Sequence, residues 1–412
     1  MHSTNCYDTF IASLEQAKDD KGNVLPGGVH VKLRAKEKNW YKIHVGGDLK
    51  QNTSSFESSS SPSFSIPEVQ MTSSLTLRNS DGNCGMSSIN YNVSQTGSTS
   101  FNLGHFQPLF SAPKPGSKSY GLSYKETSHL PTRSYSETSK SLYYLLRSGP
   151  PSTVPGSYTE LEWRTDLRNV MPNLHASVPY AYDSSEEILA ESGPNFKHSL
   201  KLTASTNGAF THKNRYVPYK GLESTLNVEL AGPPGDVGYL KTEVKGGIHI
   251  PIYKDILSSH FHVALGGIKV LKYGGMCNPV SNVSDRFYVG GPMVFRGFER
   301  GGVGPKGGRG DAIGGEVYHG GSLQLSTPFP HPVIEKLGGR IFTFGSVGGL
   351  SNLADITSIS AVKESTRVTA GIGVAVPLGN LGRGEASWAK ILRKGEGDVV
   401  QPMQFGLNLH FG

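Results

Sequence analysis

The sequence predicts an all-β protein, with a transmembrane antiparallel β-barrel of about 16 strands over residues 37–412 and a separate segment at 1–36. The clearest sign is the C-terminus, where apolar and polar residues alternate strictly from Met403 to Phe411. A strand between lipid and a wet lumen requires this alternation. The composition agrees, because the chain has 52 Gly and only 18% charged residues, and no run approaches the ~18 apolar residues of a membrane helix.

Residues 1–36 are too few for a core of their own, and they predict the end of a small α/β domain. Apolar residues recur at helical spacing over residues 7–14, which favours a short helix there. Turn-forming residues follow at 22–28, and residues 29–33 then alternate as a strand.

The remaining residues predict strands joined by turns. Clear alternation occurs at 75–77, 161–163, 226–230, 261–265 and 368–376. About 370 residues at roughly 23 per strand and connection give about 16 strands, each needing about 9–11 residues to cross a bilayer. The Ser- and Pro-rich stretches 52–66 and 147–158 predict loops.

A long glycine-rich connection at 288–314 is the strongest functional signal. It contains the run Phe295-Arg296-Gly297-Phe298, and its flanks are strand-like. Loops of this length in a β protein are usually functional or disordered. Because two aromatic residues flank a fixed charge, we expect this loop to fold back into a polar cavity, with Arg296 held by a carboxylate.

Charge and cysteine content narrow the function classes. The net charge is +7, but no cluster of basic residues interleaves with aromatic ones, so contact with anionic lipid headgroups, or a merely solvated surface, is favoured over nucleic acid. The three cysteines have neither metal spacing nor a disulfide-rich pattern.

The sequence holds none of the common signatures of an enzyme. It contains no nucleophile elbow, P-loop or dinucleotide fingerprint, so no catalytic residue and no cofactor is expected. His260 and His262 share one strand face, but no third ligand is evident, and a lumen-facing pair is favoured over a metal site.

Residues 285–330 resemble the outer-membrane barrel-assembly (bacterial surface antigen-like) superfamily. The likeness is carried by ordered motifs: DRFYVGG at 285–291, FRGF at 295–298, GGVGP at 301–305, GGE at 314–316 and TPFP at 327–330. The likeness is strongest to the core barrel subunits of the mitochondrial sorting and assembly machinery, and weaker likeness runs from about residue 27 to the C-terminus. The resemblance implies insertion of β-barrel precursors into the mitochondrial outer membrane, with lipids, precursors and accessory subunits as partners.

Three departures from the family are visible. Its N-terminal POTRA domain has the order β-α-α-β-β, and residues 1–36 hold only its last part, so the resemblance implies a β-hairpin where spacing favours a helix; we favour the hairpin. The family often places an acidic or amide residue in the strand after the loop, whereas the nearest match here is Ser346. The serine-rich stretch 52–66 is not typical of the family.

A barrel must close, because unpaired backbone groups in hydrocarbon cost several kcal/mol each. The first strand should therefore meet the last, and a weak seam would let a client strand add to the open edge. The first-strand residues of this predicted gate are Trp40, Ile43, Val45, Gly46 and Gly47.

The last strand is similar to the mitochondrial β-signal, with Gln404, Gly406, Leu409 and Phe411 in the polar, glycine and two hydrophobic places. The other interpretation is that any terminal barrel strand alternates in this way.

The alternation of side chains between the two faces of a strand also suggests a partner for Arg296. If Leu323 and Leu325 face lipid, then Gln324 and, at even spacing, Glu316 face the lumen, and we predict an Arg296–Glu316 contact. Three other functions remain open: a polypeptide-translocating channel of the same superfamily, a passive solute pore, and a soluble β-sandwich binding module.

Overall fold

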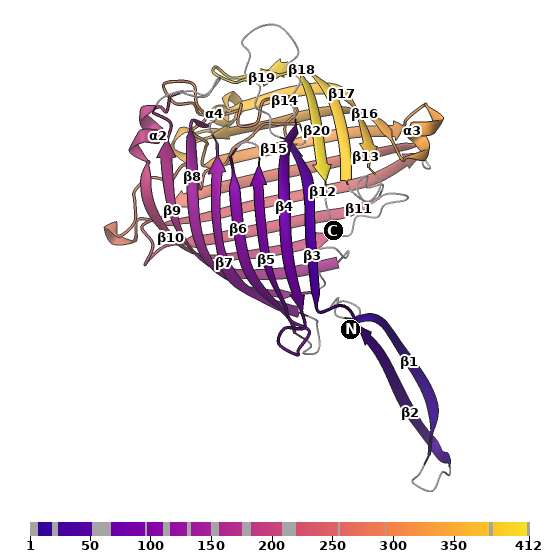
Figure 1. Cartoon of the computed structure of the whole chain (residues 1–412). Helices are drawn as coiled ribbons and strands as arrows, with labels where there is room; N and C mark the ends of the chain where they lie inside the picture. The colour runs from indigo at the N-terminus through magenta and orange to yellow at the C-terminus, as the bar shows by residue number, and fades with distance from the viewer. Residues whose placement is uncertain are drawn as a thin grey trace.

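The computed structural model describes residues 7–18, 24–51, 67–94, 97–109, 116–129, 133–149, 156–174, 183–207, 220–253, 256–292, 294–378 and 382–409. Within these residues the chain forms a 16-stranded antiparallel sheet that curls into a barrel (Figure 1). The predicted fold class and strand number are therefore confirmed.

The strands of the sheet follow the chain from one end of the barrel wall to the other. They are β3 (Tyr41–Gln51), β4 (Pro67–Arg78), β5 (Met86–Ser94), β6 (Thr99–Leu109), β7 (Gly116–Ser128), β8 (Tyr135–Ser148), β9 (Gly156–Pro172), β10 (Gly193–Asn207), β11 (Gly221–Ala231), β12 (Tyr239–Tyr253), β13 (Leu257–Val270), β15 (Val317–Pro328), β16 (Arg340–Ser351), β17 (Thr366–Pro377), β18 (Gly382–Arg393) and β20 (Met403–Leu409). Each strand pairs with its neighbours in this order, so β3 and β20 are the two ends of the sheet.

The N-terminal segment is a β-hairpin outside the barrel. It consists of β1 (Tyr7–Lys18) and β2 (Val24–Glu37), which project from the end of the barrel where β3 begins (Figure 1). The helix favoured by spacing over residues 7–14 is wrong, and the hairpin implied by the family is confirmed. Cross-strand pairs such as Leu14 with Val31 explain the pattern, because they place apolar residues on one face.

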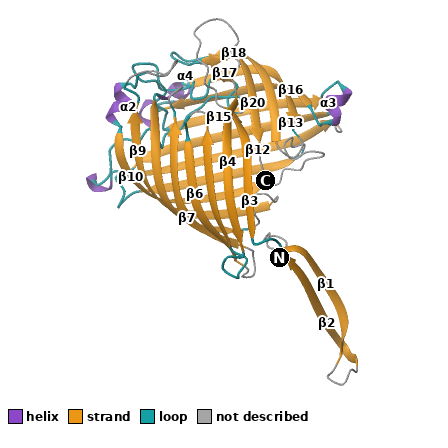
Figure 2. Cartoon of the chain, viewed as in Figure 1, coloured by secondary structure: helices purple, strands orange, loops and turns teal. Residues whose placement is uncertain are grey.

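Helices are short and lie at the rims of the barrel (Figure 2). In the described residues they include α2 (Glu186–Ala190), α3 (Pro332–Lys336) and α4 (Ile359–Glu364), with the 3-10 turns η2 (Tyr273–Gly275) and η3 (Leu353–Asp355). None of the helices in the described ranges has the length and hydropathy needed to cross a membrane.

Side-chain parity in the wall follows the sequence. Leu323 and Leu325 on β15 are 50% and 37% exposed on the outer face, while Gln324 between them is half-buried on the inner face. The predicted loop 52–66 lies outside the described residues. The predicted loop 147–158 is shorter in the structure, since β8 extends to Ser148 and β9 begins at Gly156.

Candidate functional site: the loop inside the barrel

The glycine-rich connection joins β13 to β15, so it spans residues 271–316 rather than the predicted 288–314. It folds into a compact unit through antiparallel bridges, two of which join Phe287 with Gly315 and Val289 with Val303. A two-residue strand, β14 (Gly297–Phe298), pairs with β19 (Val400–Gln401) just before the last barrel strand.

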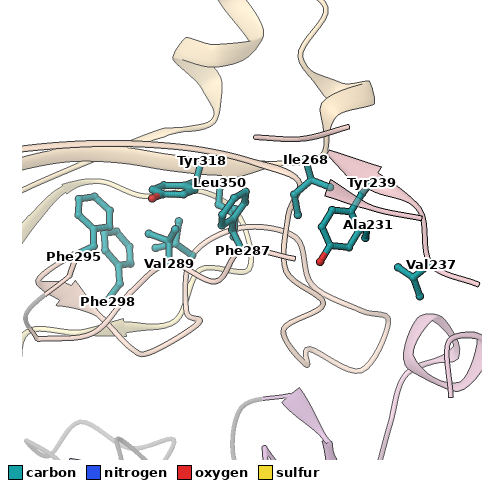
Figure 3. Close-up of a cluster of buried hydrophobic side chains, with 11 residues drawn as sticks. Ala231, Val237, Tyr239, Ile268, Phe287, Val289, Phe295, Phe298, Tyr318 and Leu350 are labelled. Carbon is teal, nitrogen blue, oxygen red and sulfur yellow. The ribbon is translucent and has the colours of Figure 1, made fainter. Parts of the chain in front are cut away.

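The loop supplies five of the eleven residues of the largest buried apolar cluster inside the barrel. Phe295 and Phe298 are 4% and 0% exposed, and their rings stack with centroids 5.2 Å apart. Figure 3 shows this pair beside Val289 and Phe287, below the strand residues Tyr318 and Leu350. The loop thus folds back into the barrel as expected, but its aromatic pair packs in an apolar cluster rather than in a polar cavity.

Arg296 lies between these two aromatic residues in the sequence, and its guanidinium binds Glu385 of β18. Its Nε donates to Glu385 Oε1 at 2.5 Å, and the two side chains are only 11% and 1% exposed. Arg383 Nη2 donates to the other oxygen, Oε2, at 2.7 Å. The guanidinium of Arg296 also lies 5.0 Å from the ring centroids of Phe342 and Phe344. One buried carboxylate thus binds two guanidinium groups, so the cluster keeps a net positive charge.

The predicted Arg296–Glu316 contact is wrong. Glu316 Oε1 accepts from the Ser281 hydroxyl at 2.8 Å, and its Oε2 accepts from the Leu353 amide at 3.2 Å, so it fastens the end of the loop to the rim. Ser346, the nearest match to the family's acidic or amide residue, does not supply the partner of Arg296. It is buried on β16 opposite Thr369, and the carboxylate that holds Arg296 comes from β18.

Position 297 requires glycine, because a side chain would not fit there. Its φ of 95° is in the left-handed region, and a Cβ there would lie 3.1 Å from Ala389 Cβ and 3.2 Å from Thr369 Cγ2. Glycine therefore allows the backbone of the loop to press against the inner wall formed by β17 and β18.

Gln404 ties the loop to the last strand. Its Oε1 accepts from the Gly297 amide at 3.0 Å, and its Nε2 donates to the Phe298 carbonyl at 2.7 Å. Of the other predicted β-signal residues, Gly406 is buried on the same inner face. Leu409 lies in β20 but the structure does not describe its side chain, and Phe411 lies outside the described residues.

A second charged anchor, which the sequence did not reveal, holds the loop to the opposite wall. Asp285 is 3% exposed and accepts from both terminal nitrogens of Arg168 at 2.9 Å, from Lys197 at 3.2 Å and from the Tyr239 hydroxyl at 3.0 Å. Burial alone would raise the pKa of the Asp285 carboxyl, but the charges of Arg168 and Lys197 outweigh it and hold that pKa below its usual range.

The segment before the last strand is also attached to the loop. Glu299 N–H donates to the Val399 carbonyl, and Val399 N–H donates to the Gly302 carbonyl, both at 3.0 Å. Arg367 of β17 and the fully buried Asp398 form an ion pair at 2.8 Å. Burial raises the pKa of the Glu299 carboxyl to about 7, against the lowering effect of the Lys306 charge. The approach to β20 is therefore held by the loop before the strand begins.

The predicted gate strands are at the ends of the sheet. Cα atoms of β3 and β20 approach within 8 Å, but in the described ranges no backbone ladder joins them. Trp40 lies just before β3 and is 68% exposed, while Ile43 and Val45 are 66% and 68% exposed on its outer face. Gly46 and Gly47 lie within β3, as predicted.

Comparison with known proteins decides the family, because the Omp85 superfamily domain matches residues 79–411. The chain belongs to the Omp85 superfamily. Relatives include the sorting and assembly machinery component 50 homolog of Bos taurus, 30% identical over 334 residues that cover 77% of this chain and 64% of that protein. The human homolog is 28% identical over 335 residues, with the same coverage. The chain thus spans less than two thirds of the length of these curated relatives.

Solved structures show the same fold. BamA from Haemophilus ducreyi lacking POTRA domains 1–3 aligns with a TM-score of 0.74 at 18% identity, covering 98% of this chain and 75% of that one. CdiB from Acinetobacter baumannii aligns with a TM-score of 0.52 at 13% identity, covering 98% of this chain and 66% of that one. The predicted resemblance to the barrel-assembly superfamily is confirmed.

Proposed function

We propose that this protein inserts and assembles β-barrel precursors in the mitochondrial outer membrane, through a lateral gate between β3 and β20. The observation that carries the proposal is the seam: within the described residues, two edge strands face each other without a ladder. An exposed strand edge is a template for pairing with another chain, so a precursor strand can add there by β-augmentation.

The relatives support the proposed membrane and the proposed partners. The mammalian relatives carry the name of the sorting and assembly machinery, which supports mitochondrial outer membrane localisation and accessory subunits of such a complex as partners. Membrane lipids would contact the outer apolar residues of the wall. The work is strand exchange rather than covalent chemistry, so we propose no enzymatic activity, no cofactor and no nucleic-acid partner.

The loop supports a role for this barrel beyond that of a passive pore. It crosses the lumen from Asp285 at β9 and β10 to Arg296 at β18, and a hydrogen-bonded plug of this kind obstructs free solute passage. A polypeptide-translocating channel of the same superfamily is the alternative. It would thread chains through the lumen instead of the seam.

A reversible closure of the seam tests the proposal. Cysteines at Lys42 on β3 and Asn408 on β20, with register scanned along both strands, should form a disulfide. Oxidation should stop precursor assembly while the barrel keeps its heat-modifiable mobility on gels, and reduction should restore assembly. Unchanged assembly by the oxidised, fully crosslinked protein would contradict the gate and favour threading through the lumen. A matched pair at Thr76 and Ser88, which already face each other on β4 and β5, controls for crosslinking itself.

A further inference from the structure

The cluster of Arg296, Arg383 and Glu385 on the inner wall has more positive than negative charge. Glu385 accepts from Arg296 Nε through one oxygen at 2.5 Å and from Arg383 Nη2 through the other at 2.7 Å. Within the described residues these are the ion pairs of both arginines. The rings of Phe342 and Phe344 lie against the guanidinium of Arg296 but carry no net charge. Two cations therefore share one anion, and one positive charge is left over.

The same cluster has hydrogen-bond donors to spare. A guanidinium has five N–H donors, and Glu385 takes one nitrogen from each arginine. Arg383 Nε is buried and has no acceptor within the described part of the chain. A buried N–H without an acceptor is costly, and in proteins such a group often marks a bound water or ion. A water would satisfy the hydrogen bonds but leave the charge, whereas an anion satisfies both.

A solute in the lumen can reach the cluster. The side chain of Arg383 is 21% exposed. β18 runs in the same direction as β3, so Arg383 near its start lies toward the end of the barrel from which the hairpin projects (Figure 1). The register partners of Glu385 on β17 and β20 are Ala375 and Gly406, which have little or no side chain to cover the cluster.

We propose that Arg296 and Arg383 form a binding site for the carboxylate group of a small soluble molecule. A carboxylate carries the single negative charge that the cluster lacks, and its two oxygens match the fork of a guanidinium. The ligand comes from solution, because the cluster faces the lumen and not the lipid.

Ligand binding at this site stabilises the docked loop. Arg296 belongs to the loop and Arg383 belongs to the wall, so both halves of the site are together only when the loop is docked. A ligand that binds one state alone shifts the equilibrium toward that state. The small carboxylate thus regulates loop docking, which is a role beyond the proposed assembly function and independent of the gate.

Calorimetric titration of the full chain in detergent with sodium acetate tests the site, at constant ionic strength maintained with sodium chloride. The wild type should bind one acetate per chain. Arg383→Gln removes one guanidinium and leaves the Arg296–Glu385 pair, so acetate should bind about 10- to 100-fold more weakly. Arg309→Gln is the matched control. It removes an exposed positive charge from the same loop, where Arg309 pairs with Asp183, and should leave the affinity unchanged.

Glu385→Gln distinguishes a ligand site from a cluster that is only structural. The change keeps the size of the side chain but removes its charge, so acetate should bind about tenfold more tightly than to the wild type. Acetate should also raise the denaturation midpoint of this variant more than that of the wild type, because the ligand then supplies the missing negative charge. A cluster that is only structural would show neither effect.

Two results would overturn the site. One is equal acetate affinity of the wild type and Arg383→Gln. The other is the absence of acetate binding by both the wild type and Glu385→Gln. Neither result bears on the gate, which the crosslinks across the seam test separately.

Discussion

Arg296→Ala should release the loop from the wall of the barrel. Removing one partner of a buried ion pair costs about 3–5 kcal/mol, because the remaining charge stays buried. Glu385 is 1% exposed, but Arg383 still donates to its second oxygen, so we expect the lower part of that range. Glu385→Ala should cost more, because it leaves both Arg296 and Arg383 without their carboxylate. A cost of about 3–5 kcal/mol corresponds to about a 150- to 4,000-fold rise in the undocked population.

Cysteine labelling measures that population. Val303 is 2% exposed and packs in the core that the loop forms, so a Val303→Cys thiol can react only when the loop leaves its place. When reclosing is fast, the labelling rate follows the open population. Peptide mass spectrometry separates this label from Cys6, Cys84 and Cys277. The rate should rise about 100-fold or more in the Arg296→Ala background, and further with Glu385→Ala.

Two further variants sharpen the result. Arg309 in the same loop pairs with Asp183 at 3.3 Å and is 56% exposed, so Arg309→Ala removes a surface pair worth about 0–1 kcal/mol and should change labelling less than about fivefold. Glu316→Ala should also have a smaller effect than Glu385→Ala, because the partners of Glu316 in the described residues are the neutral Ser281 hydroxyl and Leu353 amide. Labelling rates that stay at the wild-type level in both Arg296→Ala and Glu385→Ala would falsify the idea that the Arg296–Glu385 ion pair holds the loop in place.

Three other perturbations test the rest of the loop and the hairpin. Asp285→Asn keeps the shape of the second anchor but removes the charge that faces Arg168 and Lys197. The labelling rate of Val303→Cys should therefore rise about 100-fold. An unchanged rate would show that the loop does not need this anchor. Glu299 has a pKa of about 7 in the docked loop against an ordinary 4.5, so protonation of its carboxyl favours docking. This protonation should contribute about 3 kcal/mol to the free energy of unfolding below about pH 4.5, and the contribution should be lost as pH rises through 7. Denaturation midpoints at pH 5 and pH 8 should therefore differ, and Glu299→Gln should abolish the difference. Deleting residues 7–37 should leave the heat-modifiable mobility of the barrel intact and reduce precursor handling mildly, whereas loss of the folded barrel would make the hairpin structural.

Local patterns in the sequence were enough to predict the wall of the barrel. Each strand carries its own inside–outside alternation, so Leu323 and Leu325 could be placed on the outer face without knowledge of any neighbour. The return of the loop into the barrel could be predicted from the two aromatic residues that flank Arg296, although the apolar cluster that receives them could not. In the N-terminal hairpin a local pattern misled, since tertiary pairing of β1 with β2 overrides one turn of helical spacing.

Contacts across the lumen could not be predicted in this way. Parity marks Glu316 and Glu385 alike as inward-facing carboxylates, and it does not say which one Arg296 reaches. The choice depends on where the loop travels after Asp285, and that path is fixed by partners 117 positions away in the chain at Arg168. Asp285 stands next to Arg286 and Phe287 in a motif already singled out, so its position in the sequence was the available signal, but its partners lie on separate strands.

The anchors of the loop determine which side of the seam it supports. Asp285 binds β9, β10 and β12, Arg296 binds β18, and Gln404 belongs to β20, so one folded loop connects the middle of the sheet to its C-terminal end across the lumen. The pairing of β18 with β20 is thereby supported from inside by contacts that the seam with β3 does not share in the described residues. If the wall opens, the least costly place is therefore between β3 and β20. In the proposed mechanism, the loop serves as an internal brace that keeps the C-terminal strands in register while the edge of β3 is exposed to an incoming strand.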